Sequence, residues 1–274
     1  MDVDIALLWI EHHQQPGTPP LADAGEDQFG YLDFLCTFDG SNTVEMDGDL
    51  VNYTWNFTYS EDMIHLYGVN PQFLFQIPGV YLVTLTTTDK DGTDSDTMTV
   101  TVAPARANIS FQAGWNLLSY WVDTGESPIE NVFFEEWDNI ESILYYSEVS
   151  GWLTYHATAP YWLNTLHTVS NHNGYWVNFY ENSDNILTIE GKISRETQIH
   201  LNRGWNLVGY PCETAGLADS VLTGTGYDLL MKFDPLKEYN LASMDGMSEN
   251  MEPGKGYWVH VPADSSYTVS HIFP

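Results

Sequence analysis

Basic residues are scarce in this sequence of 274 residues: 8 Lys and Arg stand against 38 Asp and Glu, which gives a formal net charge of −30. Nucleic acids and anionic membrane surfaces are recognised through clusters of positive charge, so the composition argues against both as partners. Cations and glycans are better candidates. Such a surface suits salty or calcium-containing surroundings, where counterions screen self-repulsion over about 10 Å. A need for solubility alone explains the acidic surface equally well.

Cysteines and long apolar runs are scarce as well. Cys36 and Cys212 fall in different predicted domains, so they form no disulfide framework, and we expect two buried thiols. There is no run of about 18 apolar residues, and residues 5–10 are too few for a membrane span or the core of a signal peptide. We expect no membrane insertion in this chain, with any export signal or anchor removed or lying outside it.

Catalytic signatures are missing too. The sequence has no Gly-x-Ser-x-Gly elbow, no phosphate-binding glycine loop and no His-Glu-x-x-His helix. Asp123-Thr124-Gly125 is the triplet of aspartic proteases, which need two such carboxylates sharing a proton, but Glu213-Thr214-Ala215 stands at the equivalent place in the second half. Both triplets precede a predicted helix, so we assign them to helix capping. We expect no enzyme activity.

What the sequence does contain is a duplication. Gly114-Trp115-Asn116-Leu117 returns as Gly204-Trp205-Asn206-Leu207, and Gly174-Tyr175-Trp176-Val177 returns as Gly256-Tyr257-Trp258-Val259. The two motifs lie 60 residues apart in the first copy and 52 in the second. One unit therefore occurs twice.

Each copy is predicted to hold β-strands and one short helix. In the first copy Ser127 caps the helix, Pro128 takes its first position and Glu130 reaches back. A hairpin follows, with strands over 143–146 and 152–155, and a closing strand over 186–189. The elements expected in the second copy are a helix over 217–222 and strands over 229–233, 239–241 and 267–272.

Residues 20–103 show short alternating strands separated by turn signals, a pattern typical of an all-β sandwich. Trp55 is the predicted core aromatic, and further strands are expected over 80–87 and 98–102, around an acidic hairpin at 89–94. One more strand shows alternating apolar residues on one face, namely Leu32, Phe34, Cys36 and Phe38.

The segment carries five landmark motifs, namely Ala22-Asp23-Ala24-Gly25, Phe38-Asp39-Gly40-Ser41, Tyr53-Thr54-Trp55-Asn56-Phe57, Pro78-Gly79-Val80-Tyr81 and Asp89-Lys90-Asp91-Gly92. Through them it resembles a PKD domain, the immunoglobulin-like module of extracellular proteins. The family usually has Trp-Asp-Phe-Gly-Asp-Gly where this chain has Trp55-Asn56-Phe57-Thr58-Tyr59-Ser60, so we expect a longer loop through 62–68 in place of the glycine turn.

The duplicated region resembles a repeat of secreted and surface proteins of archaea, often found beside PKD domains. That repeat pairs Gly-Trp-Asn-Leu with a motif which this chain carries in full as Met251-Glu252-Pro253-Gly254-Lys255-Gly256-Tyr257-Trp258. The first copy keeps only Gly174-Tyr175-Trp176. The resemblance implies an extracellular or cell-surface location and no particular activity.

The predicted domain plan has three parts. Residues 1–19 are an N-terminal strand and a Pro-rich linker, 20–103 the sandwich, and 108–274 the duplicated domain, with repeat one at 108–192 and repeat two at 196–274. The N-terminal strand either packs on its own chain or completes a sheet edge of a neighbouring copy by strand addition, which would make a polymer. Its apolar residues are Ile5, Leu7, Leu8, Trp9 and Ile10.

Three kinds of candidate site follow. Asp89, Asp91, Asp94 and Asp96 offer oxygen ligands at alternate positions, as calcium loops do, although a solvated turn explains them as well. Calcium is the only cofactor with a candidate site. Asn-x-Ser/Thr sequons make candidate glycosylation sites of Asn52, Asn56 and Asn108.

The third kind of site is aromatic, since the chain has 10 Trp and 17 Tyr. We expect the Trp residues that recur to build the repeated core: Trp115, Trp176, Trp205 and Trp258. The unpaired Trp137, Trp152 and Trp162 are the better candidates for contact with a sugar.

The sequence thus predicts a mainly β protein: an immunoglobulin-like β-sandwich plus a duplicated β-rich domain with short helices. The expected function is that of a non-catalytic extracellular structural or adhesive protein of a cell surface, sheath or filament. Its partners would be other copies of itself, surface proteins or glycans. The alternative is a carbohydrate-binding appendage of a secreted hydrolase.

Overall fold

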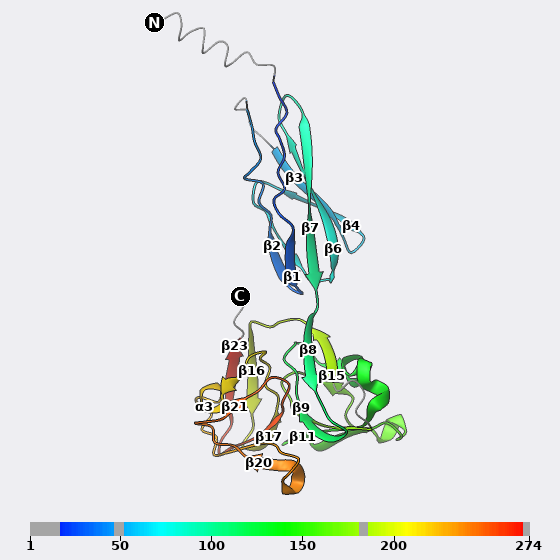
Figure 1. The fold of residues 1–274 in the computed structure, drawn as a ribbon, viewed down its shortest axis with the longest axis vertical. Coiled ribbons are helices and arrows are strands. Elements are labelled where there is room, and N and C mark those ends of the chain that lie inside the picture. Colours follow the sequence, from blue (N-terminus) through cyan, green and yellow to red (C-terminus); the bar gives the residue numbers. More distant parts are fainter. Residues whose placement is uncertain (1–16, 47–51, 181–185, 271–274) are drawn as a thin grey trace, which may run out of the picture. The chain divides into compact units, whose positions relative to one another are not determined.

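The computed structural model describes residues 17–46, 52–180 and 186–270. Within these ranges the regular secondary structure is mostly β, with two four-residue α-helices and three short 3-10 turns, so the predicted mainly β fold class is confirmed (Figure 1). The chain divides into two compact units, Met1–Pro104 and Ala105–Pro274, which are described separately.

The first unit is a sandwich of two sheets. The larger sheet has the order β1-β7-β6-β3-β4, with β1 parallel to β7 and every other pair antiparallel, and the smaller sheet pairs β2 with β5. The strands are β1 (Gln28–Tyr31), β2 (Phe34–Thr37), β3 (Asn52–Tyr59), β4 (Asp62–Tyr67), β5 (Gln72–Phe75), β6 (Gly79–Thr88) and β7 (Thr93–Ala103).

Strand alternation places the predicted residues in the core of the sandwich. Trp55, Phe38 and Cys36 are fully buried, and the rings of Phe38 and Trp55 stack at 5.2 Å. The indole of Trp55 donates a hydrogen bond of 3.0 Å to the carbonyl of Gly68, which satisfies its one polar atom. Cys36 and Cys212 are both buried free thiols, as expected, and burial raises the pKa of the Cys36 thiol to about 12.

The predicted loop at 62–68 is wrong, because residues Asp62–Tyr67 form strand β4. Ser60 and Glu61 join β3 to β4 with φ angles of 51° and 73°. Two left-handed residues in succession make the type I′ turn, whose twist matches that of the flanking strands. The tight turn is therefore kept without its glycines.

The second unit consists of two halves with the same order of elements. The first half has a four-stranded sheet β12-β11-β14-β9 and the two-stranded pairs β15-β8 and β10-β13. Its strands are β8 (Ala105–Ser110), β9 (Gly114–Leu118), β10 (Ser127–Pro128), β11 (Ile140–Ser147), β12 (Gly151–His156), β13 (Thr168–Val169), β14 (Tyr175–Phe179) and β15 (Ile186–Gly191).

The second half repeats this plan with a sheet β17-β22-β19-β20 and the pairs β16-β23 and β18-β21. Its strands are β16 (Glu196–Leu201), β17 (Gly204–Val208), β18 (Gly216–Leu217), β19 (Leu229–Phe233), β20 (Leu241–Ser243), β21 (Asn250–Met251), β22 (Tyr257–Val261) and β23 (Ser265–Ser270). Each half has a separate buried core.

The helices are shorter than predicted and are capped differently. Helix α2 (Ile129–Val132) has Pro128 as its N-cap and no side-chain capping bond, so the capping role predicted for Ser127 is wrong. Ser127 lies in strand β10, and its hydroxyl donates to the carbonyl of Thr124 at 2.6 Å. Helix α3 (Ala218–Val221) likewise has no side-chain cap.

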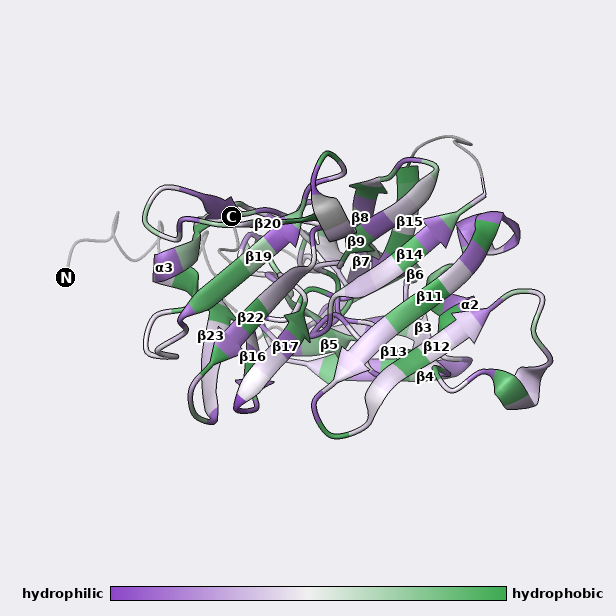
Figure 2. Cartoon of the chain, turned by 90° about the horizontal axis from the view of Figure 1, so that it is seen from below, coloured by the Kyte–Doolittle hydropathy of each residue, from purple (hydrophilic) through white to green (hydrophobic). Residues whose placement is uncertain are grey.

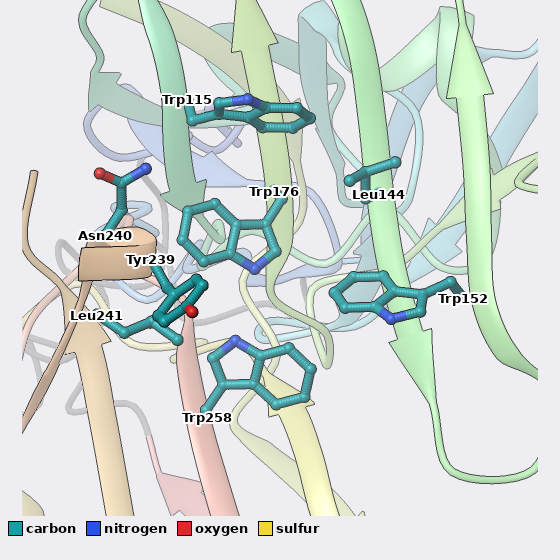
Figure 3. Close-up of a pocket in the computed structure, with 8 residues that line it drawn as sticks. All are labelled: Trp115, Leu144, Trp152, Trp176, Tyr239, Asn240, Leu241 and Trp258. Atoms are coloured by element: carbon teal, nitrogen blue, oxygen red, sulfur yellow. The ribbon is translucent and has the colours of Figure 1, made fainter.

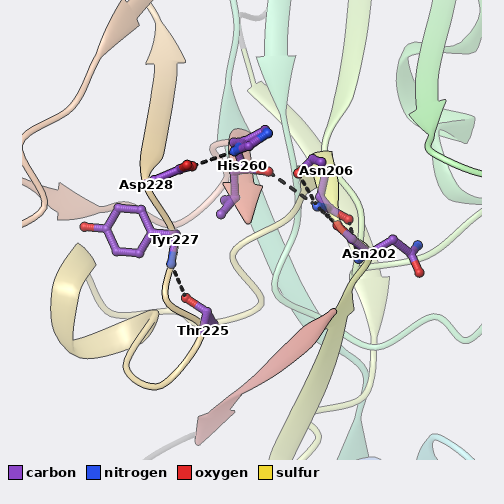
Figure 4. A network of polar contacts seen from close by, with 8 residues as sticks. Asn202, Asn206, Thr225, Tyr227, Asp228 and His260 are labelled. Carbon is purple, nitrogen blue, oxygen red and sulfur yellow. Dashed lines mark hydrogen bonds and ion pairs between the residues drawn. The ribbon is translucent and has the colours of Figure 1, made fainter. Parts of the chain in front are cut away.

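The Gly-Trp-Asn-Leu motif forms a closed turn at the start of a strand. Gly114 and Gly204 have φ angles of 82° and 104°, which glycine adopts without a steric penalty. The amide of Asn206 donates to the carbonyls of Asn202 and Gly204 and accepts the N–H of Asn202 (Figure 4). Asn116 makes the same three bonds in the first half.

The Gly-Tyr-Trp motif brings the two halves together. A Cβ added to Gly174 would lie 2.6 Å from the carbonyl oxygen of Val208 and 3.2 Å from Cα of Gly256. The N–H of Gly174 donates to the carbonyl of Leu207 across this seam, and Gly256 donates to Leu117 in the same way. The two backbones touch here, so only glycine fits.

We expect Gly174→Ala to lower the free energy of unfolding of the second unit by about 2 kcal/mol or more, because the new methyl group has no room at the seam. Urea unfolding followed by circular dichroism measures this. The control is Gly151→Ala, where φ is 71° but nothing lies within 4 Å, so that only the left-handed strain of about 1 kcal/mol is added. A loss at Gly174 no larger than at Gly151 would show that the contact is unimportant.

We also expect the second unit to lose stability between pH 10 and about 12. Burial raises the pKa of Tyr257 to about 12 and raises the pKa of Tyr175 and Tyr267 as well. A buried tyrosine that is neutral in the folded state stabilises the fold fully below the pKa that it has in the unfolded chain, near 10. This stabilisation is lost as the pH rises through the pKa that the tyrosine has in the folded state. The denaturant midpoint at increasing pH tests this, and a midpoint unchanged up to pH 12 would contradict it.

Candidate binding site

The outer faces of the two four-stranded sheets are unusually apolar. Sheets that pack on a core with one face normally turn polar residues outward. Along β11 and β19 hydrophobic residues follow one another directly, as the green segments of Figure 2 show, so side-chain alternation places them on both faces. Leu117 and Leu207 point away from the two repeat cores and, with Trp176, form the buried centre of a further apolar cluster that both repeats share.

The recurring tryptophans lie on these outer faces, which differs from the expectation that they build the core of each repeat. Side chains alternate across a strand, and in each motif the tyrosine takes the inner face. Tyr175 and Tyr257 are buried in the two repeat cores. Their neighbours Trp176 and Trp258 therefore face outward, into the shared cluster.

Side chains from both repeats line a hollow of about 320 Å³ over this cluster (Figure 3). A second hollow of about 450 Å³ adjoins it and shares Trp152, Leu241 and Trp258 with it. We call the two together the tryptophan groove. Its residues are Trp115, Leu144, Tyr146, Trp152, Trp176, Trp205, Leu229, Met231, Tyr239, Asn240, Leu241 and Trp258.

Trp258 is the centre of the groove. Its ring lies 5.8 Å from that of Trp152, 5.3 Å from Tyr146 and 6.2 Å from Trp205, in tilted or edge-to-face arrangements. Aromatic pairs in these geometries attract each other through the negative face and positive edge of the rings. The walls are thus held in place before any ligand arrives.

Polar groups are few in the groove. The indole N–H of Trp258 is shielded from solvent and has no hydrogen-bond partner among the described residues. Tyr239 and Asn240 present a hydroxyl and an amide at one edge, and the Tyr146 hydroxyl donates to Glu148 at 2.9 Å. The described lining includes no aspartate, glutamate, lysine, arginine or histidine.

Tyr239 and Asn240 both adopt left-handed backbone conformations, with φ angles of 60° and 56°. The strand predicted at 239–241 is therefore wrong at its first two positions, and β20 begins at Leu241. Asparagine tolerates this conformation, whereas for an aromatic residue it is strained. Tyr239 is 82% exposed, so burial does not offset the strain, and strain of this kind is common at binding sites.

The three tryptophans predicted to contact sugar are not close together. Trp152 is 50% exposed and lies in the groove. Trp137 packs against Tyr155 in a separate pocket, with ring centroids 4.9 Å apart. Trp162 is 78% exposed in the 3-10 turn Tyr161–Leu163 and lines neither the groove nor that pocket.

The acidic hairpin uses its carboxylates within the sandwich. Asp89 accepts the backbone N–H groups of Asp91 and Gly92, while Asp94 and Asp96 accept those of Ala22 and Ala24 at 2.9 and 2.8 Å. In the described parts of the chain no three His, Cys, Asp or Glu residues are placed to hold a metal ion. The calcium site stays a prediction.

The capping role predicted for Asp123 is wrong. Its carboxylate accepts the N–H of Gly125 and the hydroxyl of Ser194, both at 2.8 Å, and so closes a turn instead of capping α2. Of the sequons, Asn52 and Asn108 are exposed, while the half-buried Asn56 bonds to His65 at 2.5 Å. Their glycosylation stays a prediction. The predicted assembly strand at residues 5–10 lies outside the described residues.

Residues 17–103 match the family model of the PKD domain, so the predicted resemblance of this segment is confirmed. The relationship proposed for the duplicated domain stays a prediction. No curated protein matches the sequence. Within the described residues, none of the helices is long and apolar enough to cross a membrane.

Several solved structures align with the chain at low similarity. A carbohydrate-binding module from the beta-sandwich superfamily aligns over 93% of this chain and 96% of its own at 13% identity, with a TM-score of 0.28. The titin I-band fragment I67–I69 aligns over 93% and 97% at 12% identity, with a TM-score of 0.24. The eight N-terminal Ig domains of Down Syndrome Cell Adhesion Molecule align over 93% and 36% at 6% identity, with a TM-score of 0.23. Scores this low do not establish a shared overall fold.

We expect Tyr239→Asn to leave the free energy of unfolding unchanged or to raise it by about 1 kcal/mol, because asparagine relieves the left-handed strain. The exposed ring contributes little burial that could be lost. Urea unfolding measures the difference from the parent. A decrease of more than about 1 kcal/mol would mean that the ring stabilises the fold and that its strain is not evidence of a site.

Proposed function

We propose that this protein is a non-catalytic extracellular adhesive protein that holds a glycan chain in the tryptophan groove. The observation that carries the proposal is the convergence of five tryptophans from both repeats on one open groove: Trp115, Trp152, Trp176, Trp205 and Trp258. Large apolar hollows with a few polar groups are typical of ligand sites.

The chemistry of the groove suits a sugar chain. One face of a pyranose ring presents C–H groups, which pack on the negative face of an indole. The ring edges carry hydroxyls, for which the polar groups of Tyr239 and Asn240 offer partners. The groove continues from one hollow into the next, so more than one sugar unit can be accommodated.

The extracellular location rests on the PKD domain at residues 17–103, a module typical of extracellular proteins. The absence of acids and bases from the described lining of the groove supports binding without catalysis. The division of the duplicated domain into repeats at 108–192 and 196–274 is part of the proposal, since the groove is built from both. Assembly through residues 5–10 stays a prediction.

We expect Trp152→Ala to weaken binding of the preferred polysaccharide at least tenfold, because it removes a half-exposed ring from the centre of the groove. Affinity electrophoresis against a panel of polysaccharides finds the ligand, and titration of the purified chain measures the affinity. The matched control is Trp162→Ala, which removes an exposed tryptophan outside the groove and should leave the affinity unchanged.

Two results would contradict this function. The first is the absence of binding across a broad panel that includes acidic, neutral and amino sugars. The second is a loss of affinity in Trp162→Ala equal to that in Trp152→Ala, which would show contact elsewhere. Polysaccharide binding that stays unchanged in Trp152→Ala would contradict it as well, because the sugar would then be bound outside the groove.

A further inference from the structure

A second pocket, of about 590 Å³, lies in the first repeat and is separate from the tryptophan groove. It is formed by helix α2, the 3-10 turn Phe134–Asn139, strand β12 and the connection that follows β12. Those of its residues on which the argument rests are Glu130, Trp137, Tyr155, Tyr161, Asn164 and His167.

The walls of this pocket are aromatic. The rings of Trp137 and Tyr155 lie 4.9 Å apart with an angle of 35° between them. Tyr161 and His167 form a second pair, at 4.8 Å and 34°. Trp137 and Tyr155 are half-buried against the core of the repeat, so their positions are fixed by packing.

Glu130 gives this pocket a negative charge. It is an exposed residue of α2, and among the described residues it has no ion-pair partner. Its carboxylate lies close enough to Tyr155 to affect that side chain: burial raises the pKa of Tyr155, and the negative charge of Glu130 raises it further. A carboxylate beside aromatic faces makes the pocket attractive to a positive charge.

The second repeat shows what the same position looks like when it is closed. Helix α3 there starts as α2 does, with the N–H of Ala218 bonded to the carbonyl of Glu249 where Ile129 bonds to His167. Asp219 is thus the equivalent of Glu130. It accepts a hydrogen bond from the Tyr227 hydroxyl, which also lies against Gly246.

The connection between strands explains the difference. In the second repeat residues 244–249 join β20 to β21, and a Cβ added to Gly246 would lie 1.8 Å from the Tyr227 hydroxyl oxygen. In the first repeat the longer connection 157–167 joins β12 to β13 and carries the turn Tyr161–Leu163. The pocket beside Glu130 in the first repeat is therefore open, and the equivalent position beside Asp219 in the second repeat is closed.

We propose that the pocket of the first repeat binds an alkylammonium group. Aromatic faces attract such cations through their quadrupole, and Glu130 adds a full negative charge at the rim. The net charge of −30 concentrates cations near the whole protein. An exposed carboxylate also remains solvated when the pocket is empty, so no buried charge has to be stabilised.

The test uses choline and its uncharged analogue 3,3-dimethyl-1-butanol, which has the same shape, with the full chain in calorimetric titrations at low salt. We expect choline to bind at least tenfold more tightly than the alcohol. Glu130→Gln should weaken choline binding at least fivefold. The matched control is Asp219→Asn, which removes the same charge from the closed position and should leave the affinity unchanged.

A second readout locates the ligand independently of these variants. In a spectrum of the indole N–H groups, choline should shift the resonance of Trp137 and not those of Trp152 or Trp258. Equal binding of choline and the alcohol, no choline binding at about 100 mM, or shifts confined to the groove would each overturn the proposal. Equal losses in Glu130→Gln and Asp219→Asn would overturn it as well, because they would reflect net charge alone.

Discussion

The contact between Gly174 and Gly256 is the constraint on which the duplicated domain depends. The two repeats approach so closely that their backbones exchange hydrogen bonds, from Gly174 to Leu207 and from Gly256 to Leu117. Any larger residue would separate them. Because a tyrosine and a tryptophan follow each glycine, the seam also decides that the tyrosines enter the repeat cores and the tryptophans face outward.

Position relative to the seam explains what the two repeats share and where they differ. At the seam each repeat needs the other, and both contribute tryptophans to one groove. Away from the seam the structures of the two repeats can differ. The first repeat keeps an open pocket beside Glu130, whereas in the second Tyr227 donates a hydrogen bond to Asp219, the equivalent of Glu130. The duplication thus gives a joint binding surface and one site that belongs to a single repeat.

Local patterns predicted much of this fold and little of its candidate site. Alternation placed Trp55 and Cys36 in the core correctly. It could not say whether the outward face at Trp258 meets solvent or another repeat, because that depends on the seam. The strained turn at Tyr239 has no glycine to mark it, and neither has the turn at Ser60 and Glu61, so the sequence predicts a loop over 62–68 where strand β4 lies. The groove joins residues far apart in sequence, so only the folded chain reveals it.

The most direct test of the account is a titration of the labelled indole N–H groups with a fragment of a bound polysaccharide. The account predicts that the resonances of Trp152 and Trp258, from different repeats, shift together with the same dissociation constant. Trp55, buried in the sandwich, should stay unchanged. Shifts limited to one repeat, or to Trp162, would contradict the claim that both repeats form one binding groove.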